Sequence, residues 1–135
     1  MTLEGQCLCG AVRIHLARQP DRVNMCHCAS CQRRSGSPFG MAVWLMAADV
    51  AISGDTQPFA HLSDKGRETV NRFCPTCGST ICYTAALNPG LIAIPAGLFA
   101  DPETPPPLRS VFEERRHPWV AVPDGATRLP RGRDG

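Results

Sequence analysis

The chain has 135 residues and a formal net charge of +2, which fits one ordinary domain with a single core. No stretch approaches the roughly 18 apolar residues that span a bilayer, and residues 1–10 lack the basic start and apolar run of a secretory signal. We therefore expect a soluble, cytoplasmic protein with no membrane partner.

Short segments in which apolar and polar residues alternate recur between turn signals, and this pattern predicts strands. In the first of them, Val12, Ile14 and Leu16 share one face. Further strands are predicted at residues 39–45, 57–62, 68–73, 80–84 and 91–96. No stretch of 12 or more residues has helical periodicity, and only residues 47–50 and those around Phe112 fit a single helical turn. The predicted fold class is mostly β.

The C-terminal part of the chain is rich in proline. Residues 101–107 contain four prolines and are predicted to be a surface connector, because proline cannot donate a strand hydrogen bond. The following segment, 117–123, could fold back over the sheet or a cleft. We expect one domain over residues 1–121 and a flexible tail over residues 122–135, which are rich in Gly, Pro and Arg.

Seven of the eight cysteines form three clusters. These are Cys7-x-Cys9, Cys26-His27-Cys28-x-x-Cys31 and Cys74-x-x-Cys77-Gly78. Without an export signal such cysteines indicate metal ligands rather than disulfides, and thiolates suit zinc. Seven sulfurs suggest two zinc ions per chain: one closed site with four sulfurs, and one with three sulfurs and an open position, as catalytic zinc keeps.

The spacing leaves the partition of these ligands open. Cys74 and Cys77 have the form of a zinc knuckle, and Cys7 with Cys9 can complete a structural site. Cys28 and Cys31 with the knuckle would make an equally ordinary four-cysteine site, although three cysteines would then have no simple role. A redox dithiol is a further interpretation of the CxxC pairs.

The other histidines and the eighth cysteine have simpler interpretations. His27 lies between ligands in sequence and is favoured as a bystander or a residue behind the ligands rather than a ligand. Cys82 is favoured as a small buried apolar residue. His15, His61 and His117 show no ligand spacing and are interpreted as structural or surface residues.

Three motifs together resemble one known family. They are Gly5-x-Cys7-x-Cys9-Gly10-Ala11-Val12, then Cys26-His27-Cys28-x-x-Cys31-Gln32-Arg33-x-x-Gly36, and then Phe73-Cys74-x-x-Cys77-Gly78-Ser79. In order, spacing and flanking residues the sequence resembles the glutathione-dependent formaldehyde-activating enzyme family, which includes centromere protein V.

The resemblance implies twisted antiparallel sheets around zinc sites, similar to the fold of a zinc-binding Rab GTPase chaperone. It also implies that Cys7, Cys9, Cys74 and Cys77 hold a structural zinc and that Cys26, Cys28 and Cys31 hold a catalytic zinc. The implied activity is that of a carbon–sulfur lyase acting on the adduct of glutathione, or another small thiol, with formaldehyde or another aldehyde.

Four residues are candidates for binding the substrate. Arg33 or Arg34 could hold a carboxylate of the thiol, and Trp44 or Trp119 could wall the cleft. Seven thiolates and two Zn²⁺ ions would change the formal charge from +2 to −1, so the charge does not support a nucleic-acid partner. The main alternative to an enzyme is a zinc-stabilised module that binds protein or nucleic acid, and a redox sensor using Cys28 and Cys31 is a third.

Overall fold

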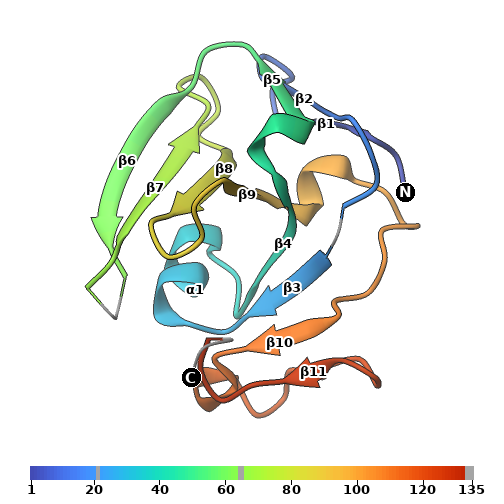
Figure 1. Cartoon of the computed structure of the whole chain (residues 1–135), viewed down its shortest axis with the longest axis vertical. Coiled ribbons are helices and arrows are strands. Elements are labelled where there is room, and N and C mark those ends of the chain that lie inside the picture. The colour runs from blue at the N-terminus through green and yellow to red at the C-terminus, as the bar shows by residue number, and fades with distance from the viewer. Residues whose placement is uncertain (21, 64–65, 133–135) are drawn as a thin grey trace.

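Two β-sheets form the framework of the computed structural model, which describes residues 1–20, 22–63 and 66–132 (Figure 1). The three-stranded sheet has the order β1-β2-β5, and the eight-stranded sheet has the order β11-β10-β3-β4-β9-β8-β7-β6. The strands are β1 Glu4–Gln6, β2 Arg13–Leu16, β3 Arg22–Cys26, β4 Gly40–Met46, β5 Val50–Ser53, β6 Gln57–Leu62, β7 Glu68–Phe73, β8 Thr80–Ala85, β9 Leu91–Pro95, β10 Arg109–Val111 and β11 Thr127–Arg128. The predicted mostly-β fold is confirmed.

The core is packed between the sheets by residues that alternate along the strands. Val12, Ile14 and Leu16 are fully buried, whereas Arg13 and His15 between them are exposed. Buried residues of β4, β8 and β9 face them. Burial of this one face fixes the register, because a slip by one residue would turn every apolar side chain toward water.

Every predicted strand is present, with ends that differ by at most one residue. The short 3-10 helices Ala47–Asp49 and Glu113–Arg115 match the two predicted turns. The helix α1, Ala29–Ser35, was not predicted, because it has seven residues, none of them buried, and so carries no apolar stripe. No helix among the described residues is long and apolar enough to cross a membrane.

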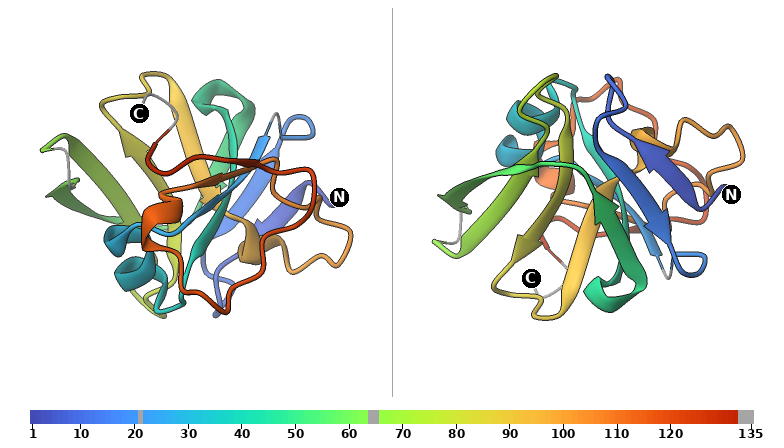
Figure 2. Two further views of the ribbon diagram at one scale, coloured as in Figure 1. Left: turned by 90° about the horizontal axis from the view of Figure 1, so that it is seen from below. Right: turned by 90° about the horizontal axis from the view of Figure 1, so that it is seen from above.

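The C-terminal part of the chain adds two strands at one edge of the large sheet. β10 pairs with β3 in parallel, and β11 pairs with β10 in parallel, unlike the antiparallel pairs elsewhere in the sheets. Seen from below, this red segment runs across the front of the molecule (Figure 2). Residues 101–107 contain no strand, as expected of a connector.

The segment 122–135, expected to be a flexible tail, contains β11 in its described part. Backbone N–H groups of Phe112 and Glu113 donate to the carbonyl oxygens of Arg131 and Leu129 at 3.0 Å each. Residues 133–135 lie outside the described part. Motion of the tail stays a prediction, but residues 127–128 extend the large sheet.

Candidate functional site

A group of four cysteines joins the first and second halves of the chain. The sulfurs of Cys7, Cys9, Cys74 and Cys77 lie within 4.8 Å of one another. Cys9 Sγ is 3.6 Å from Cys7 Sγ and 3.7 Å from Cys74 Sγ. Cys7 and Cys74 belong to the buried core, so a metal bound here would lie at its edge.

Tight turns present these four sulfurs. Gly10 and Gly78 both have φ of 79°, a left-handed conformation that glycine adopts without strain. The N–H of Gly78 donates to the Cys74 carbonyl at 2.8 Å, which closes the knuckle turn. The hydroxyl of Ser79 lies 3.3 Å from Cys77 Sγ, and this hydrogen bond lowers the pKa of the Cys77 thiol to about 5. This hydrogen bond therefore favours the thiolate form of Cys77.

The second group comes from one short segment. Cys26 ends β3, Cys28 is the N-cap residue of α1, and Cys31 lies within α1, with the three sulfurs within 4.8 Å of one another. Cys28 Sγ accepts a hydrogen bond from the Cys31 N–H at 3.3 Å, as an N-cap side chain does. The strand end and the first turn of α1 thus aim three sulfurs at one point.

Three thiolates this close together would repel one another. Hydrogen bonds between sulfurs raise the pKa of Cys26 and lower that of Cys28, so without a cation the group keeps protons to avoid facing negative charges. A bound metal cation would remove that repulsion. The donor set of both cysteine groups therefore fits a metal ion, and the partition into four and three ligands is the one that the family resemblance implies.

His27 and Cys82 lie outside both groups of candidate ligands. The ring of His27 is fully buried, and its Nε2 is 2.9 Å from the Ser110 hydroxyl on β10. Burial lowers the pKa of His27, which favours the neutral ring. Cys82 is part of the apolar core. Both residues have the positions that the simpler interpretation predicts.

Gln32 fastens the three-cysteine loop to the C-terminal segment. Its Nε2 donates to the His27 carbonyl at 2.8 Å, and its Oε1 is 2.9 Å from Nε2 of His117. Gly40 on β4 allows α1 to approach closely, since a Cβ there would lie 2.9 Å from a guanidinium nitrogen of Arg34 and 3.4 Å from Cys31 Cβ. The position of the three sulfurs thus depends on neighbours from three parts of the chain.

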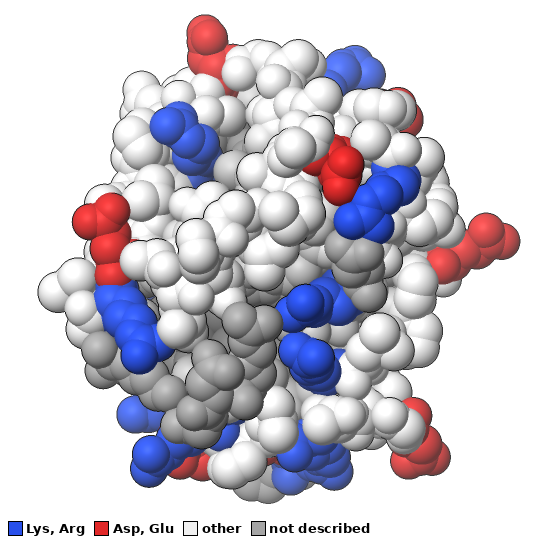
Figure 3. All heavy atoms as spheres, in the orientation of Figure 1, with Lys and Arg blue, Asp and Glu red and all other residues white. Residues whose placement is uncertain are grey.

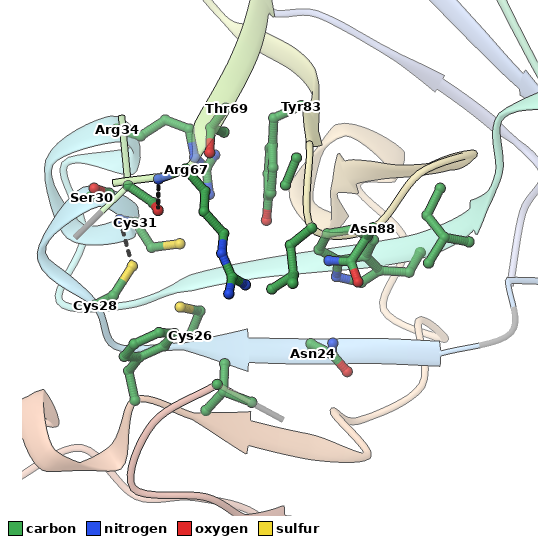
Figure 4. A pocket seen from close by; sticks show the side chains of 18 of the residues that line it. Asn24, Cys26, Cys28, Ser30, Cys31, Arg34, Arg67, Thr69, Tyr83 and Asn88 are labelled. Atoms are coloured by element: carbon green, nitrogen blue, oxygen red, sulfur yellow. Dashed lines mark hydrogen bonds between the residues drawn. The ribbon is translucent and has the colours of Figure 1, made fainter. Parts of the chain in front are cut away.

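A cavity of about 240 Å³ opens beside the three-cysteine group. Cys26, Cys28 and Cys31 line it, whereas none of the four-cysteine group does. Its walls come from α1, from strands β3, β4 and β6 to β10, and from the loops between them, and Figure 4 shows the close-up. Its size suits a small molecule rather than a macromolecule.

Aromatic residues form one wall of the cavity. Trp44 and Tyr83 meet edge to face with ring centroids 5.8 Å apart, and the guanidinium carbon of Arg34 lies 4.5 Å from the Tyr83 ring centroid. The Tyr83 hydroxyl points into the cavity (Figure 4). Burial raises the pKa of Tyr83, so this hydroxyl keeps its proton.

Of the predicted substrate residues, Arg34 and Trp44 line the cavity. Arg33 is exposed on α1, and Trp119 is 71% exposed; neither lines the cavity in the described structure. Trp119 instead meets the ring of His117, with centroids 5.7 Å apart. His61 lines the cavity, although its sequence pattern gave no sign of this, and His15 pairs with Glu4 at the surface.

Three further arginines line the cavity and were not predicted: Arg22, Arg67 and Arg109. They are far apart in the sequence, so no local motif joins them. Figure 3 shows Lys and Arg side chains in the middle and lower part of the face that Figure 1 presents. Among the described lining residues there is no Asp or Glu.

Comparison with solved structures supports the fold. The chain is similar to a crystal structure described as a Rhodobacter sphaeroides protein, Northeast Structural Genomics target RhR83, with a TM-score of 0.57 and 21% sequence identity. The match covers 76% of this chain and 91% of that one.

Comparison of sequences gives a curated relative and a family. The chain is 29% identical over 91 residues to a Schizosaccharomyces pombe protein named "Uncharacterized lyase C29B12.13". The aligned region covers 66% of this chain and 64% of that protein's length. The sequence model of the family described as "Glutathione-dependent formaldehyde-activating enzyme" matches residues 2–115, which include both cysteine groups. The chain belongs to this family.

Proposed function

We propose that the chain is a zinc-dependent enzyme of the carbon–sulfur lyase type, which forms or breaks the adduct of a small thiol with formaldehyde or another aldehyde. The observation that carries the proposal is the three-cysteine group at the wall of a cavity, beside a separate four-cysteine group at the core. Three sulfurs leave a tetrahedral ion one position for a ligand from the cavity.

The four-cysteine group fits zinc by its dimensions. Tetrahedral zinc with Zn–S bonds of about 2.3 Å separates its sulfurs by about 3.8 Å. The observed sulfur separations of 3.6 and 3.7 Å agree with that value. We assign zinc to both groups and a structural role to the first. A cytoplasmic location belongs to the proposal, because a reducing compartment keeps cysteines available as ligands.

A zinc ion bound by the three cysteines would lower the pKa of a substrate thiol and keep it as a thiolate beside the aldehyde. In the forward reaction the thiol releases its proton to solvent, a sulfur–carbon bond forms, the π bond of the carbonyl breaks, and the carbonyl oxygen takes up one proton, so the number of protons is unchanged. Tyr83 is placed to supply a hydrogen bond or a proton to that oxygen, since its hydroxyl is protonated and points into the cavity. Trp44 and Arg34 hold the Tyr83 ring in place.

The test uses the exchange of formaldehyde labelled with ¹³C between its free and glutathione-bound forms, measured by NMR exchange spectroscopy. The uncatalysed reaction is fast, so each measurement is compared with buffer and with bovine serum albumin at equal concentration. We expect the zinc-loaded protein to accelerate exchange and expect a graded chelator titration to abolish the acceleration while far-UV circular dichroism is unchanged.

Two results would contradict the proposal. One is an exchange rate equal to that of the controls with two zinc ions bound per chain. The other is loss of both zinc ions together with the fold. Either result would favour the alternative, a zinc-stabilised binding module without catalytic activity.

A further inference from the structure

His27 lies between two of the candidate metal ligands, and three of its polar groups are bonded to neighbouring elements. Its backbone N–H donates to the Val111 carbonyl on β10 at 3.1 Å, and its carbonyl accepts from Nε2 of Gln32 on α1 at 2.8 Å. Its ring Nε2 is 2.9 Å from the hydroxyl of Ser110, which is also on β10. The backbone between the two ligands is therefore tied to β10 on one side and to α1 on the other (Figure 1).

The hydroxyl of Ser110 links the His27 ring to a carboxylate. It interacts with Glu113, and hydrogen bonds from Arg128, from this hydroxyl and from Arg116 lower the pKa of Glu113 to about 2. The carboxylate is therefore ionised at neutral pH, and an ionised carboxylate only accepts hydrogen bonds. Since the hydroxyl gives its hydrogen to Glu113, its oxygen accepts a hydrogen bond from the ring.

This direction of the hydrogen bonds fixes the form of the His27 ring. Nε2 carries the hydrogen that Ser110 accepts, so Nδ1 of the neutral ring carries none. Nδ1 is buried and has no hydrogen-bond partner among the residues that the structure describes, and a hydrogen on it would be a buried donor without an acceptor. The ring thus acts as a donor with a fixed orientation.

Apolar packing does little to hold the three-cysteine loop. None of the seven residues of α1 is buried, although the helix contains Cys31 and has Cys28 as its N-cap residue. A helix this short is not stable by itself. The polar links through His27 and Gln32 therefore take the place of an apolar face.

A movement of His27 would change the distances between the sulfurs. Cys26 and Cys28 are its two neighbours in the chain, so a shift of its backbone displaces both ligands. Tetrahedral zinc with bonds of about 2.3 Å requires sulfurs about 3.8 Å apart. Loss of a residue that orients metal ligands typically weakens metal binding by roughly 10–100-fold. The links to His27 therefore bear on the metal as well as on the fold.

We infer that His27, Ser110 and Gln32 are positioning residues, through which the segment around β10 sets the spacing of the three sulfurs and raises the affinity of this group for its metal ion. The inference rests on the proposed function for the presence of a metal ion there. It goes beyond that function, because it makes retention of the metal at the cavity depend on residues outside every cysteine motif.

The test replaces zinc with cadmium-113 in the full chain and records its NMR spectrum. Cadmium is a soft cation that binds thiolates, and its chemical shift depends on the number and geometry of the bound sulfurs. We expect two signals from the wild-type protein. The signal that is lost or shifted in Cys31→Ser belongs to the three-cysteine group, and the other is an internal reference. A graded chelator competition, followed through both signals, gives the relative affinity of each group.

Ser110→Ala removes one buried hydroxyl, and Gln32→Met replaces the amide by an apolar group of similar length. Each variant should shift or broaden the signal of the three-cysteine group and lower its metal affinity about tenfold, with the other signal unchanged. The control is Ser53→Ala, which makes the same change as the first variant at an exposed position on β5. Gln32 is half-buried, so its variant still tests the inference if Ser110→Ala does not fold.

Two results would overturn the inference. One is a signal and an affinity equal to those of wild type at the three-cysteine group in the folded variants, even if the midpoint of unfolding falls. The other is an equal change at both signals, which would indicate a general loss of stability. A single cadmium signal from the wild-type protein would contradict the proposed function and the inference with it, so the two failures are distinguishable.

Discussion

The four-cysteine group and the three-cysteine group differ in where their ligands come from. Cys9 and Cys74, in contact in the first group, are 65 residues apart, whereas the second group lies entirely within residues 26–31. The first group is at the edge of the apolar core, and the second lines a cavity. A cross-link between distant segments contributes to folding, whereas an incomplete ligand set at a cavity is suited to chemistry.

The largest expected effect comes from breaking the cross-link with Cys74→Ser. A structural zinc contributes on the order of 10–16 kcal/mol of apparent binding free energy, comparable with or above the net stability of a whole domain, roughly 5–15 kcal/mol. We expect the variant to lose cooperative unfolding, measured by circular dichroism in urea. An unfolding midpoint equal to that of wild type would show that the four-cysteine group does not stabilise the fold.

Cys31→Ser should instead separate folding from chemistry. We expect a folded protein with one zinc ion fewer per chain, measured by mass spectrometry of the metal, and a fall in adduct exchange of about 100-fold or more, to the level of the controls. Cys82→Ala is the matched control, since it removes a buried cysteine that is in neither group. Retained acceleration in a folded Cys31→Ser protein would contradict the assigned role.

Tyr83→Phe tests the three-cysteine group separately from the four-cysteine group, because Tyr83 lines the cavity that only the three-cysteine group shares. It removes one hydroxyl and keeps the ring contacts with Trp44 and Arg34. We expect kcat to fall about tenfold, below the full effect of general acid catalysis because the uncatalysed reaction is easy, with KM and zinc content unchanged. An unchanged kcat would exclude a proton or hydrogen bond from Tyr83.

The smallest effect is expected at the C-terminal edge of the cavity. Glu113 bonds to Arg128 on β11 at 2.9 Å and to Arg116 at 2.8 Å, and the Arg128 hydrogen bond lowers its pKa to about 2. Because the folded-state pKa is lowered, this stabilisation is present above the unfolded value near 4.3 and is lost as the pH falls toward 2.

Glu113→Gln should therefore lower the free energy of unfolding by about 1–2 kcal/mol at pH 7, a value reduced for the exposure of Arg128. The difference from wild type should shrink below pH 4. Urea denaturation at several pH values measures it, and a difference independent of pH would mean that the carboxylate charge does not matter.

Local patterns in the sequence predict much of this structure. The alternation of Val12, Ile14 and Leu16 predicts β2, and the spacing of the cysteines predicts both groups. β10 and β11 were not predicted, because strands of three and two residues are too short to show alternation. The segment of β3 does alternate, with Val23 and Met25 buried, and this signal could have been found.

The arginines of the cavity could not have been found in the same way. Arg22, Arg67 and Arg109 have unrelated sequence neighbours, and only the pairing of β3 with β10 and the turn between β6 and β7 bring them together. Arg33, next to the cysteines in sequence, faces away because α1 rotates each successive residue by about 100°. Of the two arginines that follow the cysteines in sequence, only Arg34 lines the cavity.

The pairing of β10 with β3 also orders events during synthesis of the protein. When the ribosome has made residues 1–100, all seven candidate metal ligands have been added, but Arg109 and the strand that carries it have not. A nascent chain can thus acquire its metal before β10, which carries Arg109 in the cavity wall, exists. The polypeptide would be cross-linked early, and the wall of the cavity would be complete only after residues 109–111 have joined the sheet.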